Sequence, residues 1–298
     1  MHTGRFGAVG VGLAAAVLLL AGGAIWVARH PWRDMSHSLD RIPAVSRFRR
    51  WYTTHFGELT AELLDRLGRR GVAAAALLAG LLGVMVLAVG FAALLDDALE
   101  GDGVAEIDRP AASWLATHRE GWLNTSLTVL THLGDPAAQT IWLTVVCAVA
   151  AWRARSWLPV ILGAVGGIGI AVVLVTAKAV VGRQRPDPPF ALVASHGYSF
   201  PSGHAAGAAA VGLLSAWMLC RWVVHSWAGQ VAVWALSIAF VGVVGFSRLY
   251  LGVHFVTDVL AGWLLGTGWA ATVALVAAWW SGPDRPRIGA RSHGSGSI

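Results

Sequence analysis

Residues 156–186 read SWLPVILGAVGGIGIAVVLVTAKAVVGRQRP, and this stretch decides the class of fold. Residues 156–177 carry no charge, and their length is close to the roughly 20 apolar residues that a membrane-spanning helix needs. The apolar run is interrupted by Lys178, which is the only lysine beside 21 arginines. A charge within an apolar segment is costly, so Lys178 either snorkels to water from the helix end or has a function there.

The rest of the chain has the composition of a membrane protein. Of its 298 residues, 56% are hydrophobic and 13% are charged, whereas soluble domains have about 25% charged residues. The uncharged apolar stretches are residues 6–28, 71–95, 136–152, 156–177, 203–220, 228–247 and 259–280. We therefore predict an all-α polytopic membrane protein with a core of six transmembrane helices and an extra N-terminal transmembrane helix.

The charges between the apolar stretches predict the topology. Nine arginines lie in residues 29–70, whereas the connection that begins at Asp96 has six carboxylates before Pro110 and a single arginine. Basic connections stay in the cytoplasm. The rule therefore places residues 29–70, 153–157, 221–227 and 281–298 inside, and residues 96–135, 178–204 and 248–258 outside. Within the outer connection, Trp114, Leu115, Trp122 and Leu123 are expected along the membrane interface, which tryptophan favours.

Three parts of the chain are expected to differ in structure. Residues 1–70 are interpreted as a membrane anchor followed by a basic linker, residues 71–281 as the six-helix core, and residues 282–298 as a disordered cytoplasmic tail. The first apolar stretch is alternatively a cleaved signal peptide, although it is longer than a usual signal core. Residues 41–70 fit either a basic amphipathic helix at the inner membrane surface or a solvated helical linker.

Polar residues gather in three clusters at helix ends. They are KAVVGRQRP at residues 178–186, FPSGHAAG at residues 200–207 and SRLYLGVHFVTD at residues 247–258. Each cluster alone could consist of flanking charges or of a plain helix start. Because the helices alternate in direction, however, all three clusters lie on the same side of the membrane.

The cations and small residues of these clusters suit a phosphate group. Lys178, Arg185 and Arg248 offer positive charge, with the arginines able to contact two oxygens at once. Gly203 would let the backbone approach the anion at the start of a helix, where free N–H groups bind phosphate. Ser202 would add a hydroxyl donor.

The remaining residues supply acid and base chemistry. His254 and Asp258 are four apart, so they share one face of a helix and can form a hydrogen bond. A carboxylate on one imidazole nitrogen leaves the other free as a nucleophile or base. His204 is then available as the general acid for the leaving oxygen. A metal site that uses both histidines and Asp258 is the alternative, but the three nearby cations would repel the ion.

Taken in order, K-x6-RP, PSGH and SR-x5-H-x3-D resemble the three signature motifs of the type 2 phosphatidic acid phosphatase superfamily, which also includes vanadium haloperoxidases. The resemblance covers about residues 71–281 and implies a six-helix core. It further implies that His254 is the nucleophile, that Asp258 orients it, and that His204 protonates the leaving group. The phosphate-binding positions that it implies are Lys178, Arg185, Ser202, Gly203 and Arg248.

These observations lead to one expected function and two alternatives. We expect a cell-membrane phosphatase without a cofactor, which hydrolyses a lipid mono- or diphosphate at the outer face, and the resemblance implies that the reaction passes through a phosphohistidine. Undecaprenyl diphosphate, phosphatidic acid and phosphatidylglycerol phosphate are the candidate substrates, and the lipid bilayer is the expected partner, with no nucleic acid. The alternatives are a lipid phosphotransferase and a membrane transporter or lipid-binding protein. The motifs do not predict the oligomeric state.

Overall fold

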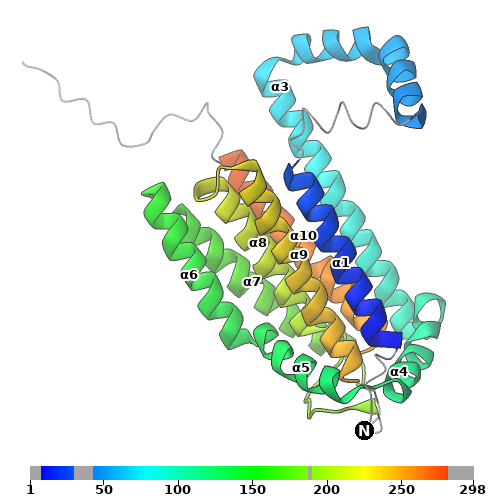
Figure 1. Cartoon of the computed structure of the whole chain (residues 1–298). Helices are drawn as coiled ribbons and strands as arrows, with labels where there is room; N and C mark the ends of the chain where they lie inside the picture. Colours follow the sequence, from blue (N-terminus) through cyan, green and yellow to red (C-terminus); the bar gives the residue numbers. More distant parts are fainter. Residues whose placement is uncertain (1–7, 30–42, 187–189, 281–298) are drawn as a thin grey trace, which may run out of the picture.

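The structure, a computed structural model, describes residues 8–29, 43–186 and 190–280. In these ranges the secondary structure is helical, without strands. Six helical segments are long and apolar enough to cross a membrane, and Figure 1 shows them side by side in a bundle. They are Ala73–Glu100 of α3, α6 (Pro136–Ala154), α7 (Leu158–Val181), α8 (Gly203–Trp222), α9 (Trp227–Tyr250) and α10 (Val256–Trp280). This confirms the predicted all-α membrane fold.

The central helix is α8, which is rich in alanine and glycine. Ala205, Ala206, Ala208 and Ala209 are fully buried. Helix α10 approaches α8 so closely that a Cβ atom at Gly266 would lie only 2.2 Å from the carbonyl oxygen of Ala206. Small residues at such crossings let two helix backbones meet. The close contact brings the N-terminal ends of α8 and α10, and therefore His204 and Asp258, to the same end of the bundle.

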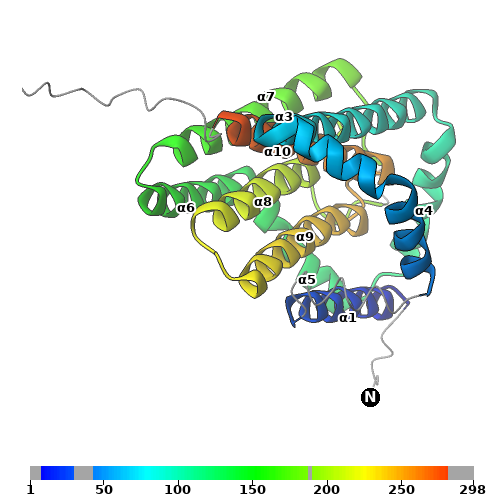
Figure 2. The same cartoon turned by 90° about the horizontal axis from the view of Figure 1, so that it is seen from above.

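Helix α1 (Ala8–Arg29) runs antiparallel to α9 along the outside of the bundle (Figures 1 and 2). At one end, the backbone N–H of Gly10 donates to the Glu120 carboxylate at 3.1 Å. At the other end, Nε1 of Trp227 donates to the carbonyl oxygen of Val27 at 2.9 Å. Helix α1 therefore extends along the bundle, and its first residues lie at the end that carries the three polar clusters.

Helix α3 (Pro43–Glu100) is a single helix of 58 residues, which joins the helix expected over residues 41–70 to the span expected over residues 71–95. No proline interrupts residues 44–100, and alanine, leucine and arginine favour helix. Figure 1 shows its first part arching away from the bundle at the end opposite the polar clusters. This part exposes Phe48 and Trp51. Its position at the inner membrane surface stays a prediction.

The connection between α3 and α6 folds into short helices at the polar end of the bundle. These are η1 (Gly103–Ile107), α4 (Asp108–Thr117), α5 (Gly121–Thr131) and η2 (His132–Gly134). Trp114 and Trp122 are exposed, whereas Leu123 is buried together with Leu127 and Tyr250. Residues four apart on α5 turn one face toward the bundle, so Leu123 packs inward, and the position of this stretch along the membrane interface stays a prediction. The predicted tail, residues 282–298, lies outside the described residues.

Candidate active site

The three polar clusters meet at one end of the bundle, as helix parity predicted. Ser202 donates its backbone N–H to the carbonyl oxygen of Asp258 at 2.9 Å, which ties the start of α8 to the start of α10. Arg185 reaches the loop between α9 and α10, where its Nη1 atom donates to the carbonyl oxygen of Val253 at 2.9 Å. Residues far apart in the sequence thus surround His254.

The imidazole of His254 lies between a carboxylate and a guanidinium. Its Nδ1 atom is 3.2 Å from Oδ2 of Asp258, and its Nε2 atom is 3.1 Å from Nη1 of Arg185. Arginine only donates and an ionised carboxylate only accepts. The proton of the neutral ring is therefore on Nδ1, and Nε2 presents a lone pair.

The surroundings of His254 favour this neutral form. Burial lowers the pKa of His254 to about 4, and Arg185 and Arg248 act in the same direction, against the opposing effect of Asp258. The ordinary value for histidine is about 6.5. At neutral pH His254 is therefore unprotonated at Nε2 and able to act as a nucleophile or base.

Arg183 holds the other oxygen of Asp258. Its Nη1 atom donates to Oδ1 of Asp258 at 2.8 Å, and its Nη2 atom donates to Oδ2 of Asp108 at 2.8 Å. Asp108, which is 2% exposed, also accepts the backbone N–H of Thr257 at 3.0 Å. In the sequence, Arg183 of the KAVVGRQRP cluster is explained equally well as a flanking charge, and no motif marks Asp108. Together they fix the carboxylate that orients His254.

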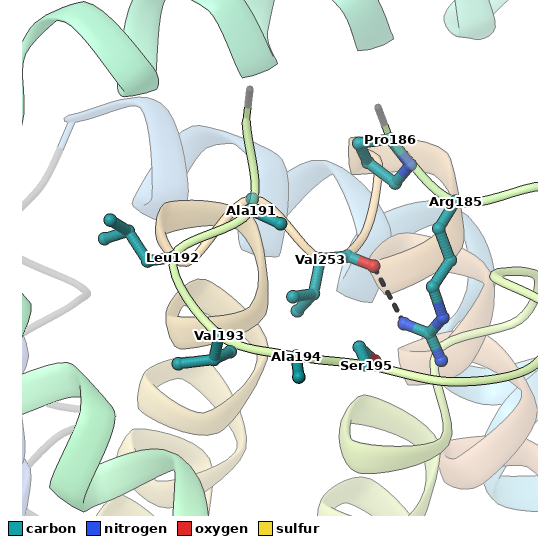
Figure 3. A pocket seen from close by; sticks show the side chains of 9 residues that line it. Arg185, Pro186, Ala191, Leu192, Val193, Ala194, Ser195 and Val253 are labelled. Carbon is teal, nitrogen blue, oxygen red and sulfur yellow. Dashed lines mark hydrogen bonds between the residues drawn. The ribbon is translucent and has the colours of Figure 1, made fainter. Parts of the chain in front are cut away.

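Arg185 also anchors the segment between α7 and α8. Its Nε atom donates to the carbonyl oxygen of Gly197 at 2.9 Å, and its Nη2 atom donates to that of His196 at 3.1 Å. A cavity of about 340 Å³ opens beside Arg185, as Figure 3 shows. Its lining residues are Arg185, Pro186, Ala191, Leu192, Val193, Ala194, Ser195, Gly252 and Val253. Arg185 is the one charged residue in this lining, so the rest of the cavity wall suits an uncharged group.

Lys178, in the last turn of α7, reaches the turn that precedes α8. Its Nζ atom donates to the carbonyl oxygens of Tyr198 at 2.5 Å and Ser199 at 3.5 Å. A Cβ atom at Gly203 would lie 3.9 Å from Cε of Lys178. The side chain therefore approaches the PSGH turn, as the sequence suggested.

Of the five buried side-chain polar atoms that lack a hydrogen-bond partner within the described residues, two belong to the polar clusters at this end of the bundle. They are Oγ of Ser202 and Nε of Arg248. Ser202 is the N-cap residue of α8, yet its hydroxyl does not cap the helix. Arg248 uses Nη1 to donate to Oγ1 of Thr131 at 2.8 Å. Buried polar groups are normally paired, so these two donors are available to a group that binds here.

His204, the second residue of α8, is held by the carboxylate of Asp135, which belongs to none of the three motifs. Its Nε2 atom is 2.9 Å from Oδ1 of Asp135. Asp135 immediately precedes Pro136 at the start of α6, so from sequence alone it looks like an ordinary helix-capping residue. No local pattern could have revealed its pairing with a histidine 69 positions away.

Comparison with known proteins agrees with this geometry. The sequence model of the PAP2 superfamily matches residues 157–281. Phosphatidylglycerophosphatase B of Bacillus subtilis (strain 168) is 33% identical over 177 residues, which cover 59% of this chain and 86% of that protein. The chain belongs to the PAP2 superfamily. As a PAP2 protein with six apolar spans, it is a multi-pass membrane protein.

Other PAP2 relatives differ in the substrates that their names give. A decaprenylphosphoryl-5-phosphoribose phosphatase of Mycobacterium tuberculosis (strain ATCC 25618 / H37Rv) is 33% identical over 57% of this chain and 82% of its own length. An undecaprenyl-diphosphatase of Sulfolobus acidocaldarius is 37% identical over 33% of this chain and 46% of its own length. A crystal structure of a transmembrane PAP2 type phosphatidylglycerolphosphate phosphatase from Bacillus subtilis superposes with a TM-score of 0.62 at 29% identity, covering 68% of this chain and 98% of that one.

Proposed function

We propose that this PAP2 protein is a lipid phosphatase that hydrolyses a lipid mono- or diphosphate through a phosphohistidine on His254. The observation that carries this proposal is the unprotonated Nε2 atom of His254 at the end of the bundle where two buried donors, Oγ of Ser202 and Nε of Arg248, lack a partner within the described residues. A nucleophile beside unpaired donors is the arrangement that phosphoryl transfer requires.

In the proposed mechanism, three cations and a helix start bind the phosphate. The guanidinium group of Arg248, whose Nε atom has no partner within the described residues, can contact two phosphate oxygens. Arg185 already donates to the carbonyl oxygens of Gly197, Val253 and His196, so it contributes mainly its positive charge. Lys178 adds a compact positive charge beside Gly203. The first N–H groups of α8 and the hydroxyl of Ser202 complete the set, because a helix N-terminus is a natural anion site.

Two histidines then carry the chemistry. The Nε2 lone pair of His254 attacks phosphorus while the bond to the lipid oxygen breaks, and His204 protonates that oxygen. In the second step, water attacks the phosphohistidine and gives its proton to His204. The phosphorus–nitrogen bond breaks, which returns the electron pair to His254 and releases phosphate.

The position of the charged groups supports a lipid substrate. Lys178 is in the last turn of α7, His204 is the second residue of α8, and Asp258 is the third residue of α10. The site therefore lies at the depth of lipid head groups, beside helices with exposed apolar faces. Charges in a transporter pathway would be expected near the middle of the bilayer, so this placement favours the phosphatase over the transporter.

The head group and the membrane side are the finer parts of the proposal. The printed names of the relatives include a phosphatidylglycerophosphatase and an undecaprenyl-diphosphatase, so both monoester and diphosphate lipids belong in the panel of substrates. The arginine-rich connections at the opposite end of the bundle favour an outward-facing site. We also expect hydrolysis without a metal ion, because the three cations supply the charge that a metal would otherwise provide.

The test is phosphate release by the detergent-purified protein from phosphatidic acid, phosphatidylglycerol phosphate and undecaprenyl diphosphate, with a chelator present. We expect release from at least one lipid, and a loss of at least about a thousandfold in His254→Ala. His118→Ala is the matched control, because His118 is an exposed histidine that stacks on Trp114. When the reaction of the wild type is quenched during turnover, we expect to detect a phosphoenzyme that is labile to acid and stable to base.

Two results would overturn the proposal. Equal phosphate release by His254→Ala and the wild type would show that His254 is not the nucleophile. Activity that disappears with the chelator and returns with a divalent cation would replace the proposed mechanism by a metal-dependent one.

A further inference from the structure

Asp135 bridges two histidines at the edge of the candidate active site. Its Oδ1 atom is 2.9 Å from Nε2 of His204, and its Oδ2 atom is 2.8 Å from Nδ1 of His132. The hydrogen bonds from these two histidines lower the pKa of Asp135, although partial burial alone would raise it. Asp135 is therefore a carboxylate whose two oxygens are both used by imidazoles.

The helix start at Asp135 does not explain this geometry. An aspartate at an N-cap normally accepts a backbone N–H of the first helical turn. Asp135 is the N-cap residue of α6, but its side chain makes no such bond. The carboxylate turns instead toward His204, which belongs to a different helix.

The turn before α6 is packed against His204. A Cβ atom at Gly134 would lie 2.9 Å from Cδ2 of His204 and 2.6 Å from Cγ1 of Val244. The carbonyl oxygen of Gly134 accepts a hydrogen bond from Nε2 of the buried Gln139 at 2.8 Å. The position of Asp135 relative to His204 is thus fixed by the packing of η2 and α6.

We propose that Asp135 is the positioning residue of His204, so that each of the two histidines works with a carboxylate of its own. This inference rests on the proposed function. Asp258 orients the nucleophile His254, and Asp135 orients the proton donor His204. His132, whose side chain is 69% exposed, connects the second pair to solvent.

The geometry also assigns the nitrogen that acts on the leaving group. The carboxylate of Asp135 only accepts, so Nε2 of His204 carries a hydrogen and Nδ1 is left to face the reaction. When the phosphorus–oxygen bond breaks, the proton on Nδ1 moves to the lipid oxygen. When water attacks the phosphohistidine, the water proton moves to Nδ1. The negative charge of Asp135 favours the imidazolium form that His204 needs before the first step and regains after the second.

The experiment compares two substrates on the same variants. An alkyl phosphate, dioctanoyl phosphatidic acid, has a poor leaving group that needs protonation, whereas p-nitrophenyl phosphate releases a stable phenolate that needs little. In Asp135→Asn we expect kcat/KM to fall about 30-fold for phosphatidic acid and less than about threefold for p-nitrophenyl phosphate, since general acid catalysis contributes about 100-fold or more. Asp102→Asn, an exposed aspartate of the same connection, is the matched control and should leave both values unchanged.

A double-mutant cycle shows whether Asp135 acts through His204. Adding Asp135→Asn to His204→Asn should cause no further loss with phosphatidic acid. Asp135→Glu, which keeps the carboxylate, should recover part of the loss. Both substrates are assayed on one preparation, so a lower folded fraction scales both rates equally and leaves their ratio unchanged.

The inference is overturned if Asp135→Asn slows both substrates by the same factor, or if its effect adds fully to that of His204→Asn. Either result would mean that Asp135 only supports the local fold. Failure of the proposed function is distinguishable, because His254→Ala would then hydrolyse both substrates as fast as the wild type.

Discussion

Lys178 combines an unusual residue choice with a confined position. Its ammonium group donates to the carbonyl oxygens of Tyr198 and Ser199 from the last turn of α7. A guanidinium is planar and larger, so an arginine here would keep the charge but not this fit. We expect Lys178→Arg to lower kcat/KM about tenfold or more, which corresponds to ~1.4 kcal/mol.

The measurement is phosphate release from the preferred lipid, with Arg153→Lys as the matched control. Arg153 is exposed in the last turn of α6, at the opposite end of the bundle. Full activity of Lys178→Arg would show that the position needs only a positive charge, and that the single lysine of the chain has no special role.

His254 links the site to the pH dependence of stability. Its pKa of about 4, set first by burial and then by Arg185 and Arg248, is below the ordinary value, which is about 6.5 in an unfolded chain. Between these two values the unfolded state binds more protons, so stability falls as the pH decreases through this window. From about pH 7 to about pH 5 this one group should cost the folded protein about 2 kcal/mol.

Thermal unfolding in detergent can isolate this contribution. The unfolding temperature of the wild type should fall more between these two pH values than that of His254→Gln, which has no group to titrate. The partners that face His254, namely Asp258, Arg185 and Arg248, remain in both proteins. An equal fall in the two proteins would contradict a lowered pKa of His254.

At the scale of the elements, hydropathy was sufficient to predict the six spans of the core. The expected span 136–152 became α6 (Pro136–Ala154), and the expected span 259–280 became most of α10 (Val256–Trp280). Each span must pair its backbone groups internally in lipid, so a long apolar run has few alternatives to a helix. The motifs at the span ends then indicated which residues would meet.

The supporting residues of the site could not be predicted in the same way. Asp108 and Asp135 come from the connection between α3 and α6, whose short helices carry no strong sequence signal. In sequence, an aspartate at a helix start is adequately explained by capping or by the helix dipole. Their partners, Arg183 and His204, lie 75 and 69 residues away. Only the packing of this connection against α8, α9 and α10 brings each pair together.

At the scale of the whole molecule, the fold separates the candidate site from the basic parts of the chain. Asp108, Asp135 and the three motifs lie at one end of the bundle, and the arginine-rich start of α3 lies at the other (Figure 1). Basic segments stay in the cytoplasm, so we predict that the site faces outward. A cysteine at position 102 should then react with a membrane-impermeant maleimide in intact cells.

The control for labelling at position 102 is a cysteine substitution of His225. This residue is exposed in the connection between α8 and α9, at the opposite end of the bundle. Both cysteines are introduced after the native Cys147 and Cys220 have been replaced by alanine. We expect Asp102→Cys to be labelled in intact cells and His225→Cys to be labelled only after permeabilisation. The reverse pattern would place the site in the cytoplasm, and the substrate would then have to be a lipid phosphate of the inner leaflet.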